Sequence, residues 1–414
     1  MFLRQQYLEK LIQAEGNGMI KIITGVRRCG KSFLLFTLFR NYLLEHGTDE
    51  EHIIEVDLEN RLNKKLRDPD ALLEYIYSKL SNEGHYYVLL DEVQLVREFE
   101  DVLNSFLKLT NVDVYVTGSN AKFLSKDVIT EFRGRGWEIR LHPLSFAEFY
   151  EYRGGDRQDA FRMYCRYGGL PQVVLMDTEE EKKEYLHIVF ETTYLRDVIE
   201  RNHLRNAAGL EALVRVLASG IGSSTNAKRI ADTFCSKGIA MTQDTIKTYI
   251  EHLRDAFIIS DALRYDVKGR KYIGTETKYF FEDLGIRNVV LGFRQEEETH
   301  LMENAIYNEL VLRGFSVDVG MVEVWELSDG KRVRKNLEVD FVVNRAPRRI
   351  YIQSAYALPT REKTDQEQRS LMKIPDHFRK LIVVGDNHGG WVDEEGIEIV
   401  GLYDFLLKPE VIEE

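Results

Sequence analysis

The sequence is short of cysteine, of long apolar runs and of positive charge. Its three cysteines, Cys29, Cys165 and Cys235, are scattered and form no C-x-x-C pair, which fits a reducing cytoplasm. No apolar run reaches the roughly 18 residues that a transmembrane helix needs. The first residues, MFLRQQYLEKLIQ, are too polar for the core of a signal peptide. We therefore expect a cytoplasmic protein that has no membrane partner.

The net charge of −12 excludes a surface that is basic overall, so any contact with nucleic acid has to come from a local patch. The remaining composition, 44% hydrophobic and 30% charged residues, is ordinary for a globular protein. A chain of 414 residues is long enough for roughly two to four domains with sizeable cores.

A phosphate-binding loop follows the apolar run at residues 20–23. Gly25, Gly30, Lys31 and Ser32 complete the G-x-x-x-x-G-K-[ST] pattern, and a helical pattern follows at residues 33–44. Glycines let successive backbone N–H groups face the phosphates, and the helix N-terminus adds a partial positive charge. We expect Lys31 to bridge the β- and γ-phosphates and Ser32 to hold Mg²⁺. The predicted nucleotide-binding residues of this loop are Gly25, Val26, Arg27, Arg28, Cys29, Gly30, Lys31, Ser32 and Phe33.

A second apolar segment, at residues 86–90, ends in Asp91 and Glu92. Its length without polar alternation predicts a strand that is buried on both faces. Placed after a complete P-loop, the two acids resemble the end of a Walker B strand. Asp91 is then a Mg²⁺ ligand, and Glu92 polarises the attacking water. The alternative is an ordinary strand followed by solvated acids.

Two further segments supply candidates for sensing and completing the site. Another buried strand is predicted at residues 112–117, and Ser119 or Asn120 after it is a candidate γ-phosphate sensor; a turn with a helix cap is the alternative. Arg133 and Arg135 precede a short strand, and either is a candidate arginine finger for a neighbouring subunit. A finger acting in this way implies a homo-oligomer, whereas the alternative is a surface salt bridge or a packing role.

The stretches GVRRCGKS, VLLDEVQ, VTGSN, GRG and LHPLSFAEF occur in this order. Together they resemble the AAA-type ATPases of bacteria and archaea that carry a C-terminal domain of unknown function, and the related archaeal ATPases. This resemblance covers most of the chain. It implies an ATPase core that uses ATP and Mg²⁺, with the P-loop, Walker B and sensor roles given above.

The middle of the chain has helical patterns at residues 179–199, 209–218, 226–235 and 242–256. The first is expected to belong to a helical lid, with Arg196 either a second sensor or a partner of Asp197 or Glu200. The other three precede strands at residues 257–265 and 279–282, which lie on either side of a charged loop. Ser224 or Thr225 is expected to cap the helix at residues 226–235. This order predicts a winged helix-turn-helix. Polar and basic residues on its third helix suit a DNA major groove, but packing or binding to a protein partner is the alternative.

The last part of the chain is similar in its predicted element order to the PD-(D/E)xK nuclease fold. A helix at residues 301–312 carries Glu303 and Glu309, and a strand at residues 335–343 carries Glu338 and Asp340. The strand at residues 349–355 has Gln353 and Ala355 where the metal-binding acid and the lysine should stand. A helix at residues 362–373 and a strand at residues 380–384 follow. The altered strand predicts an inactive domain, and a weak metal site at the remaining acids Glu309 and Asp340 is the alternative. The basic clusters at residues 331–335 and 345–349 are candidate phosphate contacts, with solvated loops as the alternative.

The predicted fold class is α/β: a P-loop NTPase with a parallel sheet and a helical lid, then a winged helix-turn-helix, then an α/β restriction-endonuclease-like domain. The expected divisions are residues 1–155, 156–205, 206–288 and 289–414. The predicted function is Mg²⁺-dependent hydrolysis of ATP, coupled to DNA or to a protein partner. The alternatives are a slow nucleotide-controlled binding switch and an active DNA nuclease that uses Asp340.

Overall fold

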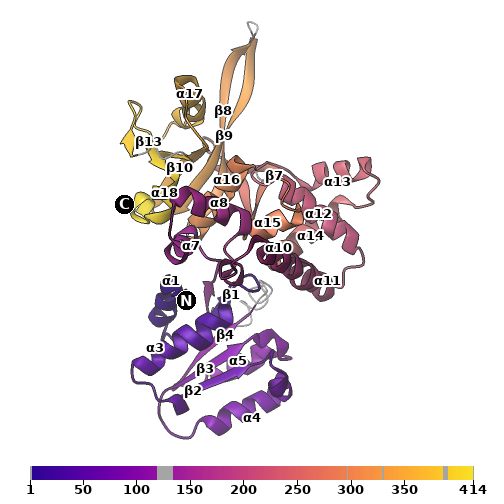
Figure 1. The fold of residues 1–414 in the computed structure, drawn as a ribbon, viewed down its shortest axis with the longest axis vertical. Helices are drawn as coiled ribbons and strands as arrows, with labels where there is room; N and C mark the ends of the chain where they lie inside the picture. The colour runs from indigo at the N-terminus through magenta and orange to yellow at the C-terminus, as the bar shows by residue number, and fades with distance from the viewer. Residues whose placement is uncertain (1, 119–133, 296, 329–330, 386–389, 414) are drawn as a thin grey trace. The chain divides into compact units, whose positions relative to one another are not determined.

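A computed structural model describes residues 2–118, 134–295, 297–328, 331–385 and 390–413 of the chain (Figure 1). The chain divides into two compact units. Unit 1 comprises Met1–Pro143, Leu170–Gln172 and Arg254–Phe257. Unit 2 comprises Leu144–Gly169, Val173–Leu253 and Ile258–Glu414. None of the helices in the described residues combines the length and the apolar character that crossing a membrane requires.

The described strands of unit 1 form one parallel sheet in the order β2-β3-β4-β1-β5. Their bounds are β1 Ile20–Thr24, β2 Ile53–Asp57, β3 Tyr86–Asp91, β4 Val112–Thr117 and β5 Gly136–Arg140. The strands expected at residues 20–23, 86–90 and 112–117 are confirmed. Every residue of β1 and β3 is buried, because helices cover both faces of a parallel sheet. Strand β4 lies between β1 and β3, which brings the ends of these three strands to one edge of the sheet.

The helices of unit 1 pack around this sheet. The helix expected at residues 33–44 begins two residues earlier, at the P-loop lysine, and runs on through a π-helical segment as α2, η1 and α3. Apolar residues of β1, β2, β3 and β4 form a core with α4 and α5. The helical bounds in this part of the chain are α1 Gln5–Gln13, α2 Lys31–Phe33, η1 Leu34–Phe39, α3 Arg40–Glu45, η2 Glu50–His52, η3 Arg61–Arg67, α4 Pro69–Lys79, η4 Val93–Leu95 and α5 Phe99–Phe106.

The described strands of unit 2 form a mixed sheet in the order β12-β13-β11-β10-β9-β8-β6-β7. Their bounds are β6 Ile259–Asp266, β7 Lys271–Phe281, β8 Ser316–Ser328, β9 Lys331–Arg345, β10 Arg348–Ala355, β11 Arg379–Val384, β12 Trp391–Val392 and β13 Glu398–Gly401. The prediction of a charged loop between two short strands is wrong. Most of that segment forms the long strand β7, which is paired with β6. Strand β6 also pairs in parallel with β8. One sheet therefore runs across the expected division at residue 288, and the four-part division of the chain stays a prediction.

Helices from residue 146 onward agree with most of the predicted helical segments. They are α7 Phe146–Arg153, α8 Arg157–Tyr167, α9 Pro171–Val174, α10 Glu179–Ile188, η6 Val189–Leu195, α11 Arg196–Arg201, α12 Ala207–Ser219, α13 Ala227–Ser236, α14 Gln243–Asp255, α15 Leu284–Val290, α16 Glu298–Leu312, α17 Arg361–Met372, α18 Leu402–Leu407 and α19 Glu410–Glu413. The prediction that Ser224 or Thr225 caps α13 is wrong. The cap is Asn226, whose side chain accepts the Arg229 N–H at the start of this helix. Arg196 pairs with Glu200 at 2.6 Å, so the ion-pair alternative is confirmed.

Candidate nucleotide-binding site

The loop between β1 and α2 has the backbone conformation that its glycines predict. Gly25 has a φ of 141° and Gly30 a φ of 104°, and Arg28 between them also has a positive φ of 67°. A Cβ on Gly25 would lie 2.1 Å from the carbonyl oxygen of Leu141, so only glycine fits there. The side chain of Cys29 is buried and its Sγ lies 3.5 Å from the same carbonyl oxygen. The residue that follows β5 therefore fixes the position of the loop.

Lys31 and Ser32 stand at the first turn of the helix, as the motif predicts. The Nζ of Lys31 donates to the carbonyl oxygens of Gly25 at 2.9 Å and of Val26 at 3.1 Å, so the loop's own backbone satisfies the buried ammonium group. The exposed Ser32 donates its hydroxyl to Asp91 Oδ2 at 2.8 Å. This hydrogen bond joins the P-loop to the end of β3, and the shared Mg²⁺ site stays a prediction.

Thr117, the last residue of β4, was not among the predicted site residues. Its hydroxyl donates to Asp91 Oδ1 and accepts the Glu92 N–H at 2.9 Å. Burial raises the pKa of Asp91, and the hydroxyls of Thr117 and Ser32 oppose that rise by donating to the carboxylate. The signal in the sequence was a polar residue at the end of the otherwise buried strand VDVYVT. The sequence alone favours Ser119 and Asn120, which follow this strand, as the candidate sensors.

Glu92 begins the turn after β3 in a left-handed conformation, with a φ of 53°. Strand β3 ends at Asp91, directly before this residue. Gln94 donates its side-chain amide to the Glu92 carboxylate. Glu92 is half-buried and lies beside the carboxylate and hydroxyl groups of the predicted metal site. The position suits a group that orients a water molecule.

The remaining predicted site residues are less directly placed. Ser119, Asn120 and Arg133 lie outside the described residues. Arg135 is exposed just before β5, and its carbonyl oxygen accepts the N–H of Ile20 at 2.9 Å. Ile20 begins β1, whereas the P-loop follows the other end of that strand. The backbone of Arg135 therefore lies at the edge of the sheet opposite the P-loop of its own chain.

A second cluster of charged side chains lies in unit 2, in the part of the chain that is predicted to have a nuclease-like fold. Lys278 Nζ on β7 contacts Glu303 at 2.9 Å, Glu338 at 2.8 Å and Asp340 at 3.6 Å. Asp340 also accepts the N–H of Ser354 at 2.9 Å. Among the described residues, no group of three or more acids, histidines or cysteines is arranged to hold a metal ion. The position between these three carboxylates is taken by an ammonium group.

The charges in this cluster shift one another's ionisation. Burial lowers the pKa of Lys278, but the three carboxylates outweigh burial and raise the pKa above its ordinary value. Burial raises the pKa of Glu303 to about 7, although Lys278 opposes that rise. Burial also raises the pKa of Asp340. The cluster therefore holds a permanently charged lysine, and its buried carboxyl groups Glu303 and Asp340 ionise with difficulty.

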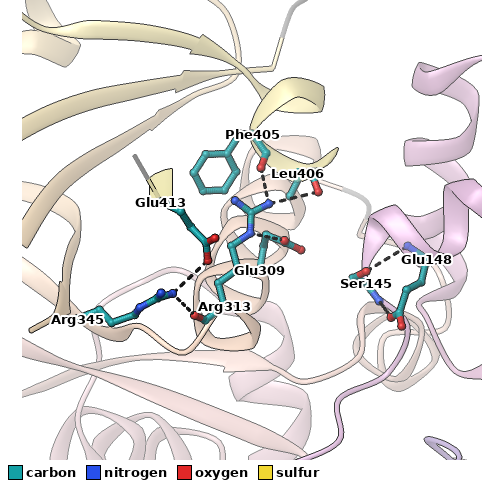
Figure 2. A network of polar contacts seen from close by, with 8 residues as sticks. All are labelled: Ser145, Glu148, Glu309, Arg313, Arg345, Phe405, Leu406 and Glu413. Atoms are coloured by element: carbon teal, nitrogen blue, oxygen red, sulfur yellow. Dashed lines mark hydrogen bonds and ion pairs between the residues drawn. The ribbon is translucent and has the colours of Figure 1, made fainter. Parts of the chain in front are cut away.

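Glu309, which the sequence offers beside Asp340 as a candidate metal ligand, belongs to a different network (Figure 2). It accepts a hydrogen bond at 2.6 Å from Arg313, whose guanidinium group also donates to the carbonyl oxygen of Phe405 at 2.7 Å. Arg345 donates to Glu413 and to the carbonyl oxygen of Arg313, as Figure 2 shows. The grouping of Glu309 with Asp340 is therefore wrong, and Glu303 is the helix α16 acid that reaches Asp340's cluster.

Comparison with known proteins agrees with this geometry. Residues 17–150 match the model of an AAA domain, and residues 158–297 match a domain of unknown function, DUF8612. An uncharacterised protein of Haemophilus influenzae is 32% identical over 414 residues, covering 99% of each chain. An uncharacterised protein of Methanocaldococcus jannaschii is 28% identical over 336 residues, covering 78% of this chain and 72% of that one.

A Walker-type ATPase of Pyrococcus abyssi has a similar solved structure, with a TM-score of 0.51 at 17% identity over 70% of this chain and 96% of that chain. This likeness supports the fold that the strand order of unit 1 defines. The near-complete match to the Haemophilus influenzae protein, at 32% identity, establishes a shared family. The chain belongs, with that protein, to a family of AAA-type P-loop proteins.

Proposed function

We propose that the protein is a Mg²⁺-dependent ATP hydrolase. The observation that carries the proposal is the chain of hydrogen bonds that joins Ser32, Asp91, Thr117 and the backbone of Glu92 beside the P-loop lysine. The groups lie at the ends of three adjacent parallel strands, where α/β sheets place their ligands. Hydrolysis of a nucleotide needs such a combination of phosphate-binding amides, a cation, metal ligands and a carboxylate near water.

Each side chain has a distinct task in this mechanism. Lys31 exchanges the carbonyl oxygens of Gly25 and Val26 for phosphate oxygens when ATP binds, which transfers its charge to the reacting group. The Ser32 hydroxyl and the Asp91 carboxylate offer the hard oxygen ligands that Mg²⁺ prefers. When bound, the metal neutralises phosphate charge. Glu92, held by Gln94, accepts a hydrogen bond from the attacking water and aligns it with the γ-phosphate.

Measured ATP turnover tests this assignment. Lys31→Ala is expected to abolish nucleotide binding, whereas Glu92→Gln is expected to bind ATP but to lower turnover by about 10²- to 10⁴-fold. Lys64→Ala, which removes an exposed lysine of η3, is the control and is expected to behave as the wild type. Turnover by Glu92→Gln at the wild-type rate would show that another group activates the water. Tight ATP binding by the wild type with little turnover would favour a nucleotide-controlled switch instead.

We further propose that Arg135 acts on the site of a neighbouring subunit. Arg135 is exposed, and its backbone lies at the edge of the sheet opposite the P-loop of its own chain. Both observations support action in trans. Lys31→Ala and Arg135→Ala are each expected to be inactive alone, and mixing them should restore part of the turnover, because mixed assemblies contain some intact sites. No recovery under conditions where the two variants co-assemble counts against a shared site.

We also propose that α12, α13, α14 and the β6–β7 hairpin act as a winged helix that contacts DNA or a protein partner. Exposed polar residues Thr242, Gln243, Lys247 and Thr248 on or next to α14 support the proposal. Asp244, which lies 3.6 Å from Lys247, offsets part of the positive charge. ATP turnover measured with and without duplex DNA tests the coupling. Stimulation that is lost in Lys247→Glu but kept in Lys64→Ala supports it, and unchanged turnover opposes it.

A further inference from the structure

Strands β8 and β9 continue well beyond the sheet of unit 2 as a two-stranded ribbon (Figure 1). On the side of β8 that faces away from β9, strand β6 pairs with β8 only from Val319 to Met321. On the other side of the ribbon, β10 pairs with β9 from Phe341 onward. In the described part of the chain, residues 323–328 and 331–336 therefore pair with each other and with no third strand. We call these two segments the distal ribbon.

The distal ribbon exposes large apolar side chains. Trp325 is 63% exposed, Leu327 78% and Val333 47%. Trp325 lies opposite Arg334 and Leu327 lies opposite Arg332 in the register, and residues directly opposite in an antiparallel pair share a face. One face thus carries a tryptophan, a leucine and two arginines. Exposed aromatic and aliphatic groups gathered on one face are typical of an interaction surface.

The ribbon also concentrates positive charge in a protein whose net charge is −12. Strand β9 carries Lys331, Arg332, Arg334 and Lys335 within five residues, and all four are exposed. Glu323 pairs with Arg334 at 2.5 Å and Glu326 pairs with Lys335 at 3.8 Å. Neither Lys331 nor Arg332 forms an ion pair with another described residue. These two cations are available to an anionic partner: Arg332 shares the face of Trp325 and Leu327, and Lys331 lies opposite Ser328 on the other face.

We infer that the distal ribbon binds duplex DNA. A two-stranded β-ribbon fits the major groove of B-form DNA, whereas the major groove of duplex RNA is too deep and narrow for it. Lys331 and Arg332 would contact phosphates, which attract cations whatever the sequence. Trp325 and Leu327 would lie against base edges, where the thymine methyl group offers an apolar contact in the major groove. Charge complementarity favours a polyanion over a neutral protein groove. The inference concerns a different surface from α14 and needs no ATP turnover.

Binding of the full-length protein to a fluorescent duplex of about 25 base pairs, measured by anisotropy without nucleotide at several salt concentrations, tests the inference. Lys331→Gln/Arg332→Gln is expected to weaken binding about tenfold or more and to lower the slope of log K against log salt by about 2, one for each lost phosphate contact. Trp325→Ala is expected to weaken binding several-fold with the slope unchanged, because its contacts carry no charge.

The control Arg157→Gln/Lys408→Gln removes two exposed cations elsewhere in unit 2 and is expected to bind as the wild type. All variants are compared by circular dichroism, since the substituted side chains are exposed and the fold should persist. Three outcomes overturn the inference: no binding of the duplex by the wild type, equal binding by Lys331→Gln/Arg332→Gln, or equal binding of duplex RNA. A change in the molar mass of Trp325→Ala with unchanged DNA binding would also overturn it, because the ribbon would then join copies of the chain.

Discussion

At the scale of single residues, Thr117 is the group whose role depends most on its surroundings. Its hydroxyl donates to the Asp91 carboxylate and accepts the Glu92 N–H, so one atom positions both acids of the site. Thr117→Val keeps the shape of the side chain and removes this atom. We expect a loss of at least tenfold in ATP turnover and of about 1–3 kcal/mol in the free energy of unfolding, since the buried Asp91 carboxylate and the Glu92 N–H both lose a hydrogen-bond partner.

Thr117→Ser is the matched control, because it restores the hydroxyl and should recover most of the turnover. Steady-state turnover and urea denaturation measure the two effects. If Thr117→Val hydrolyses ATP as fast as the wild type, Thr117 does not position the acids.

Lys278 offers a second prediction at this scale. Its ammonium group is buried between Glu303, Glu338 and Asp340. Lys278→Met fills the space but leaves the carboxylates without their counter-ion, so we expect the free energy of unfolding to fall by about 3–5 kcal/mol. Lys183→Met removes one member of an exposed pair with Glu179 and is expected to change stability by less than about 1 kcal/mol. Equal stability of the two variants in guanidinium denaturation would contradict the buried role of Lys278.

The pKa of Glu303, which burial raises to about 7, predicts a dependence of stability on pH. The unfolded chain releases this proton near the ordinary value of 4.5, whereas the folded chain keeps it up to about pH 7. The folded state binds more protons in that window, so the free energy of unfolding should fall as the pH rises from about 4.5 to 7.

Other buried carboxyls act in the same direction, so the test compares the wild type with Glu303→Gln, which cannot ionise. The variant is expected to have a shallower slope in urea denaturation between about pH 5 and pH 8. Identical slopes would mean that Glu303 does not titrate in this window.

At the scale of elements, the P-loop is positioned by its contact with the chain after β5. Gly25→Ala would place a Cβ 2.1 Å from the Leu141 carbonyl oxygen, in addition to the strain of a φ of 141°. We expect loss of nucleotide binding, measured with a fluorescent ATP analogue. Gly47→Ala also has a positive φ, of 90°, but its Cβ meets no atom within 4 Å. It should destabilise the chain by about 1 kcal/mol and keep nucleotide binding. Retained binding in Gly25→Ala would show that the loop tolerates a shift there.

At the scale of the whole molecule, the sheet of unit 2 determines where the chain can be cut. A fragment of residues 289–414 loses β6 and β7, and with them Lys278 and the neighbour of β8. It would expose an unpaired strand edge and leave buried acids without a cation. We expect this fragment to aggregate or to be degraded by protease, whereas a fragment of residues 258–414 should be more resistant. Equal resistance in limited proteolysis would favour an independent domain that begins near residue 289.

Much of unit 1 could be predicted because its signals are local. The P-loop glycines and the lysine are adjacent in sequence, and the apolar runs of β1, β3 and β4 show burial on both faces without any tertiary information. The predictions failed where distant segments meet. Glu303 and Glu309 lie on the same helix, and nothing in the sequence indicates which of them faces Asp340. Similarly, the loop expected before residue 279 becomes strand β7 because β6 offers a paired edge.

The sequence by itself determined the nucleotide loop, the acidic end of β3 and the alternation of helices and strands, because these depend on local spacing and on continuous apolar runs. The tertiary structure decided which polar groups meet. It brought Thr117 to Asp91 because β4 lies between β1 and β3, and it brought Lys278 to three acids because β7 joins the same sheet as β9. Such pairings depend on strand order and helix packing, which bring together residues that are far apart in the chain.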